Sequence, residues 1–161
     1  MKNTVTVSTP SDVEIVVTRE FDAPRLLVWE AHTKPELLKR WGAGPPGWEM
    51  PECEMDVRVG GAWRWLLRGP GGAEMRLHGV HTEIVVGERV SRTEVFEPAW
   101  YSGEAITTMA LKERGGRTIL TFTIRHISKE ARDAALKFPM ADGMAAGYDL
   151  LDELLRHSLR A

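Results

Sequence analysis

The feature that most constrains the fold is a succession of strand-like segments between residues 52 and 126, separated by glycine turns. Gly60-Gly61, residues 69–72, Gly87 and Gly115-Gly116 divide this region into stretches in which apolar and polar residues alternate. Strands joined by such short turns pair with antiparallel neighbours, because a parallel neighbour requires a long crossover connection. The region therefore predicts an antiparallel meander that is apolar mainly on one face.

The segment of residues 19–42 predicts two short helices ahead of this meander. Pro24 and Pro35 each stand where a helix begins, since the fixed φ and missing N–H of proline cost little in a first turn. Leu38 and Trp41 belong to an apolar stripe on the second helix. Because helices this short cannot bury their own apolar faces, we expect the pair to dock on the sheet.

A long amphipathic helix is predicted from about Pro139 to residue 159. Its apolar stripe contains Met140, Met144, Tyr148, Leu151 and Leu155. A shorter helix begins at Ser128, whose side chain suits the N-cap position.

The order of these elements predicts an α+β fold. Residues 14–21 alternate as one further strand, and residues 1–12 are expected to form a flexible segment or an edge strand. Residues 13–161 then form a single domain, in which a curved antiparallel sheet of six to seven strands wraps around the final helix. We expect a gap between sheet and helix, closed at one end by the two short helices, that can hold a ligand.

Three stretches carry a resemblance to a known family. They are REFDAPRLLVWEAHTKPELLKRWG (residues 19–42), VGGAWRWLLRGPGG with HGVHTEIVVGERV (residues 59–72 and 78–90), and GGRTILTFTIRH with GMAAGYDLLDELL (residues 115–126 and 143–155). The chain resembles the SRPBCC (START-like, helix-grip) superfamily, and within it the group named after the heat-shock-protein ATPase activator homologues. The resemblance implies the helix-grip fold and a cavity that binds a small hydrophobic or amphipathic molecule.

The same resemblance leaves two alternative functions open. One is an enzyme of the polyketide cyclase or hydrolase type acting in that cavity, and the other is a co-chaperone-like protein-binding module. No nucleophile–base pairing, Walker loop or dinucleotide fingerprint is present, so the residues favour binding over catalysis and call for no cofactor. The separate chaperone-binding region of the eukaryotic activators has no room in 161 residues, so chaperone binding is not expected.

All six tryptophans lie in the first hundred residues, and four of them are candidate cavity-lining residues. Trp63 and Trp65 share one strand face, which by family resemblance points inward. Trp41 and Trp48 flank the loop expected to close one end of the gap. An aromatic wall suits a flat or apolar ligand. The alternative is that these side chains are plain core.

A cation and an anion stand on a strand face that is otherwise apolar. Arg92 and Glu94 alternate with Val90 and Phe96 on one face, where the family usually carries bulky apolar or aromatic residues. A buried charge is unfavourable unless it is paired, so two interpretations remain. The pair either anchors a carboxylate or carbonyl of a ligand, or a register slip or bulge turns both side chains to solvent.

The remaining candidates are one histidine and the apolar residues of the same faces. His78 and His81 are three apart and point to opposite faces of a strand, which does not suit a zinc site, but His78 is expected to face the cavity. Gly143 and Gly147 either leave room for a ligand or allow close packing of the last helix. The further lining residues are Phe96, Met109, Phe122, Met140, Met144 and Tyr148.

Composition excludes several classes of partner. With 21 basic and 23 acidic side chains the formal charge is −2, which does not suit a nucleic-acid-binding face. No apolar run approaches the ~20 residues that span a bilayer, and the first residues lack the apolar core of a signal peptide. The single cysteine, Cys53, requires no oxidising compartment, so we expect a cytoplasmic protein. A homodimer is compatible with the sequence.

Overall fold

The computed structural model describes the backbone of residues 3–160 and the side chains of residues 3–157. Its elements, in chain order, are β1 (Thr6–Ser8), β2 (Glu14–Phe21), α1 (Arg25–Thr33), α2 (Pro35–Trp41), β3 (Glu49–Met55), β4 (Ala62–Arg68), the 3-10 turn η1 (Pro70–Gly72), β5 (Glu74–Val85), β6 (Arg89–Glu97), β7 (Ala105–Arg114), β8 (Arg117–Arg125), α3 (Lys129–Leu136) and α4 (Met140–Arg160).

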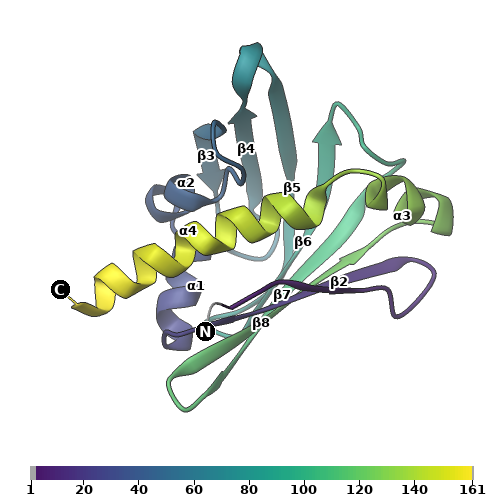
Figure 1. Cartoon of the computed structure of the whole chain (residues 1–161). Helices are drawn as coiled ribbons and strands as arrows, with labels where there is room; N and C mark the ends of the chain where they lie inside the picture. Colours follow the sequence, from purple (N-terminus) through teal and green to yellow (C-terminus); the bar gives the residue numbers. More distant parts are fainter. Residues whose placement is uncertain (1–2, 161) are drawn as a thin grey trace.

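The described strands form one antiparallel sheet in the order β1-β2-β8-β7-β6-β5-β4-β3. Strands β3 to β8 follow one another as the predicted meander, and β2 pairs with β8 to extend it. The sheet has eight strands rather than six or seven because the three-residue β1 adds an edge strand beside β2. The curved sheet and the long helix α4 across one of its faces confirm the predicted helix-grip architecture (Figure 1).

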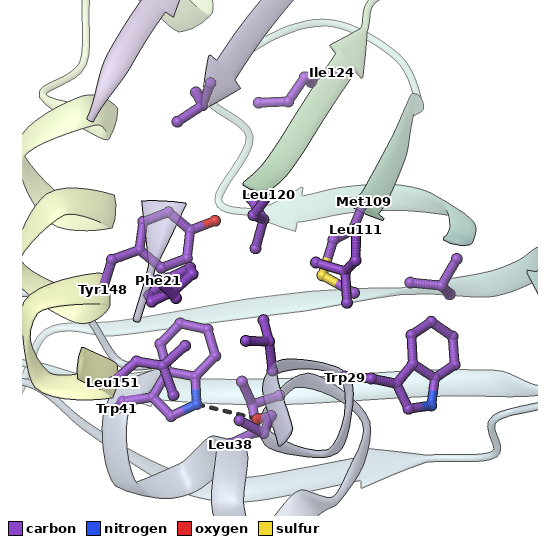
Figure 2. Close-up of a cluster of buried hydrophobic side chains, with 14 of the residues drawn as sticks. Phe21, Trp29, Leu38, Trp41, Met109, Leu111, Leu120, Ile124, Tyr148 and Leu151 are labelled. Carbon is purple, nitrogen blue, oxygen red and sulfur yellow. Dashed lines mark hydrogen bonds between the residues drawn. The ribbon is translucent and has the colours of Figure 1, made fainter. Parts of the chain in front are cut away.

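The two short helices dock as their sequence predicts. Pro35 occupies the first turn of α2, and Pro24 directly precedes α1. Helix α1 contacts β7, β8 and α4, and α2 contacts β3 and α4. The indole N–H of Trp41 donates to the carbonyl oxygen of Ala31 at 3.1 Å, which joins the two helices (Figure 2). Their apolar faces are thereby buried at one end of the sheet.

The C-terminal half of α4 is fixed to the core. Leu151 and Leu155 are buried there, and the ring of Tyr148 contacts that of Phe21 edge to face, with 5.5 Å between centroids (Figure 2). Among the described helices, including this one of 21 residues, none is both long enough and apolar enough to cross a membrane.

An ion-pair cluster links α4 to β2. Arg19, which is fully buried, donates through one guanidinium nitrogen to Asp152 and through the other to Asp149 at 3.0 Å. Asp152 is also buried, whereas Asp149 is partly exposed. A buried arginine requires such partners, because its charge cannot be left without hydrogen bonds in an apolar interior. The cluster fixes where α4 crosses the sheet.

The two glycines of α4 differ in their surroundings. A Cβ atom at Gly147 would lie 3.1 Å from the carbonyl oxygen of Trp41, so the helix approaches the end of α2 closely there. A Cβ atom at Gly143 would meet only the ring of Pro45, at 3.7 Å. Gly44, with φ +88°, is itself close to the Gly143 carbonyl oxygen. Of the two interpretations, close packing therefore explains Gly147.

Candidate ligand-binding cavity

A cavity of about 420 Å³ lies between the sheet and the N-terminal half of α4. Strands β4 to β8 contribute its floor and α4 covers it, while residues 41–48 and residues 135–139 close its ends. The cavity exists because the C-terminal half of α4 is held against the core, whereas the N-terminal half spans the curved sheet. Its apolar and aromatic wall is formed by residues that include Leu38, Trp48, Leu67, Met75, Leu77, Trp100, Ile124, Ala135 and Phe138.

Most of the side chains predicted to line a cavity lie on this wall. The structure brings together Trp41, Trp48, Trp65, Arg92, Glu94, Phe96, Met109, Phe122, Met140, Met144 and Tyr148. They come from two helices, four strands and one loop, and are therefore distant in sequence. Gly143 and Gly147 also border the space.

Three aromatic rings form a stack that leads from the cavity to the surface. Phe96 of β6 stacks on Trp100, with 4.5 Å between centroids and 18° between planes. Trp100 stacks on Phe138 at 4.9 Å and 15°. Phe138, between α3 and α4, is exposed. The mouth of the cavity on this side is thus lined by flat apolar surfaces.

Two of the predicted lining residues do not reach the cavity. His78 points away from it, with a side chain that is 41% exposed and hydrogen-bonded to Glu97 at 3.0 Å. Leu77 lines the cavity, and since successive side chains alternate, His78 must lie on the outer face. The prediction for His78 is therefore wrong. Trp63 is buried beside the cavity wall, where its indole N–H donates to the carbonyl oxygen of Thr93 at 3.0 Å.

Arg92 and Glu94 both face the cavity. Their residues are 8% and 9% exposed, so the alternative in which they turn to solvent is wrong. Strand β6 keeps a regular register with β7 from Arg89 to Glu94, and the bulge lies in the neighbouring strand β5, between His81 and Glu83. The alternation of β6 is therefore unbroken, and the two charged side chains stay on the inner face.

The guanidinium of Arg92 lies among aromatic rings. It stands 5.3 Å from the ring centroids of both Trp63 and Trp65, within cation–π range. It makes no hydrogen bond or ion pair with any residue that the structure describes. Burial lowers the pKa of Arg92 to about 10, opposed by the negative charge of Glu94. The side chain is therefore still a cation at neutral pH.

Glu94 has one defined partner. The hydroxyl of Tyr101 donates to its carboxyl oxygen at 3.0 Å. Burial raises the pKa of Glu94 to about 7, although the Tyr101 hydrogen bond and the charge of Arg92 both act to lower it. Burial also raises the pKa of Tyr101. At neutral pH the Glu94 carboxyl thus exchanges a proton readily, as a group in an acid–base or ligand-binding site does.

Three further polar residues of the site were missed by sequence reasoning. They are His32, Tyr101 and His126, which lie on a helix and in loops where strand alternation gives no signal. The ring Nδ1 of His32 donates to the Val28 carbonyl at 2.7 Å, and burial lowers the pKa of His32 to about 4. Burial also lowers the pKa of His126. Both histidines are therefore neutral at pH 7.

Several polar atoms on the cavity wall have no hydrogen-bond partner. Within the described residues these are Nε2 of His32, both ring nitrogens of His126 and Nε1 of Trp65. Buried polar groups are almost always hydrogen-bonded in folded proteins, so such atoms mark places where a bound molecule can supply the partner. None of them belongs to a metal site, since no three His, Cys, Asp or Glu side chains of the described structure are grouped to hold an ion.

Comparison with known proteins places the fold in a family. The family model described as Activator of Hsp90 ATPase homolog 1-like protein matches residues 22–156. Among curated proteins, none matches the chain.

Solved structures agree over nearly the whole chain. A protein from Rhodobacter sphaeroides is 29% identical, with a TM-score of 0.90, covering 96% of this chain and 99% of that one. A protein from Arthrobacter aurescens is 25% identical, with a TM-score of 0.82 and coverages of 94% and 91%. A protein from Chromobacterium violaceum is 26% identical, with a TM-score of 0.75 and coverages of 90% and 98%.

Proposed function

The chain belongs to the Activator of Hsp90 ATPase homolog 1-like protein family, and on this premise we propose that it binds a small hydrophobic molecule in the cavity between the sheet and α4. One observation carries the proposal: a space of about 420 Å³ inside the fold is walled mainly by aromatic, methionine and leucine side chains. Ligand pockets of proteins have this size and this lining.

The physical reason is the hydrophobic effect. Each Å² of apolar surface that a ligand removes from water contributes about 25 cal/mol, so a largely enclosed ligand gains several kcal/mol from the walls alone. Met109, Met140 and Met144 add flexible side chains that adapt to the shape of a guest. Such a wall binds a ligand mainly through apolar contacts rather than through many hydrogen bonds.

Fluorescence titration with N-phenylnaphthylamine (NPN), a neutral apolar dye, tests the proposal. We expect the dye to brighten on binding and to be displaced by competing hydrophobic molecules. Met144→Trp places an indole into the cavity from α4 and is expected to abolish binding. Ile106→Trp, on the exposed face of β7, is the matched control and should leave the dye bound. Dye binding that Met144→Trp leaves unchanged would contradict the proposal.

A second candidate is an enzyme that acts in the same cavity. Glu94, hydrogen-bonded to Tyr101 and with a pKa of about 7, is suited to take up and release a proton near a bound substrate. Incubation with a panel of aryl esters and cyclisable polyketide mimics tests this function. Turnover that Glu94→Gln abolishes while NPN still binds would support it, whereas absence of turnover across the panel would argue against it.

A further inference from the structure

The cavity wall carries a cation that has no hydrogen-bond or ion-pair partner among the described residues. Arg92 carries five N–H donors, and a buried charge is strongly unfavourable unless other groups neutralise and hydrogen-bond it. The other buried arginine, Arg19, follows this rule through Asp149 and Asp152. Arg92 does not: its guanidinium lies over the rings of Trp63 and Trp65, borders the cavity, and has no hydrogen-bond or ion-pair partner in the described part of the chain. Its donors remain available to a molecule in that space.

The nearest acidic side chain does not occupy these donors. Glu94 is two residues along the same strand face, but its carboxyl group accepts a hydrogen bond from Tyr101, and no hydrogen bond or ion pair joins it to Arg92 in the described structure. The two side chains therefore lie next to each other on the cavity wall but have different contacts. An acceptor placed at Arg92 would lie close to Glu94 as well.

We propose that the ligand of this cavity is an amphipathic anion, with an apolar body and one acidic head group that binds the guanidinium of Arg92. This inference rests on the proposed function, since it names the class of molecule that the cavity takes. A carboxylate or sulfonate matches the planar guanidinium with two parallel hydrogen bonds. The aromatic and methionine wall then receives the apolar body.

Charge balance implies that this anion binds together with a proton. The head group would sit beside Glu94, so the two anions repel unless Glu94 is protonated. The other ionisable groups on the cavity wall are His32, Tyr101, His126 and Tyr148, and α4 presents no charged side chain to the space. Burial holds the two histidines neutral and raises the pKa of both tyrosines, so none of them supplies a counter-charge. Two groups outside the wall, Cys53 of β3 and His81 of β5, also interact with the charge of Arg92. Burial raises the pKa of Cys53 to about 11 and lowers that of His81, so both stay neutral and Glu94 is left as the group that responds.

Two dyes that differ in a single charge test the inference. Anilinonaphthalenesulfonate (ANS) is an anion, and NPN has the same ring system without the sulfonate. We expect the wild-type protein to bind ANS about tenfold more tightly than NPN at about pH 6, because the sulfonate forms charge-assisted hydrogen bonds with a buried guanidinium. Arg92→Met should remove this preference by weakening ANS binding, and Arg92→Lys should restore part of it.

Arg64→Met is the matched control, since Arg64 lies on the exposed outer face of β4 and pairs there with Glu54. This variant should bind both dyes as the wild type does. Wild-type protein that binds NPN as tightly as ANS would overturn the anion proposal and leave the apolar cavity standing. Failure to bind either dye would instead overturn the proposed function. Loss of the ANS preference in Arg64→Met would assign it to the surface and contradict the role of Arg92.

Discussion

Replacing Glu94 by glutamine should change how stability depends on pH. Glutamine keeps an acceptor for the Tyr101 hydroxyl but cannot ionise. In the folded protein the pKa of Glu94 is raised from 4.5 to about 7, so the folded state holds this proton more tightly than the unfolded state does. The stability that protonation provides is complete below about pH 4.5 and is lost as the pH rises through about 7.

The size of this effect follows from the pKa values. A tenfold change in proton affinity corresponds to about 1.4 kcal/mol. Raising the pKa from 4.5 to about 7 therefore removes on the order of 3 kcal/mol of stability between acidic and mildly alkaline pH. This is a large share of the total stability of a typical domain.

Urea unfolding followed by tryptophan fluorescence at about pH 5 and about pH 8 measures the effect. We expect the wild type to lose about 2–3 kcal/mol more than Glu94→Gln across this range. The buried histidines titrate in both proteins and cancel in the comparison. Glu104→Gln, at an exposed carboxyl, is the control and should follow the wild type. Parallel pH profiles for wild type and Glu94→Gln would refute the argument that burial governs this carboxyl.

Three further outcomes are expected. Asp152→Ala should lower the free energy of unfolding by about 3 kcal/mol, because it leaves the buried Arg19 charge poorly paired. Asp149→Ala, at a partly exposed carboxylate, should lower it by about 1 kcal/mol or less. Equal losses for the two variants in urea unfolding would contradict this description of the ion-pair cluster. Gly143→Ala should raise the free energy of unfolding by about 0.5–1 kcal/mol, because alanine has the higher helix propensity. Gly147→Ala should give a smaller gain or a loss, because the new methyl group would lie 3.1 Å from the Trp41 carbonyl oxygen. Thermal unfolding of both variants measures this difference. Affinity for ANS should fall as the pH rises through about 7 in the wild type and stay level in Glu94→Gln, as titrations in buffers of equal ionic strength would reveal.

The strands and helices could be predicted because their signals are local. Alternation with a period of two marks β4, β6 and β8, and glycine turns set an antiparallel order. The orientation of Arg92 and Glu94 could not be decided in the same way. One extra residue in a strand reverses every side chain beyond it, and such a bulge occurs in β5 but not in β6. Sequence alone does not distinguish the two strands.

The polar part of the candidate site depends on contacts between distant segments. His32 is on α1, Tyr101 in the connection from β6 to β7, and His126 directly after β8. No periodic pattern places a loop side chain, so their positions follow only from the path of the chain in the folded protein. For His78 the prediction failed for a different reason. A histidine in a strand can face either side of the sheet, and in β5 the alternation of side chains places Leu77 on the inner face instead.

Methionine methyl NMR tests most directly whether a small molecule occupies the space beneath the N-terminal half of α4. Met75, Met109, Met140 and Met144 line the cavity, whereas Met50 and Met55 lie outside it and serve as internal controls. On titration with NPN we predict that the methyl signals of the four lining residues shift and show NOEs to the dye, while those of the two controls do not. Shifts confined to Met50 and Met55, or NOEs to neither group, would contradict the assignment of the cavity as the binding site.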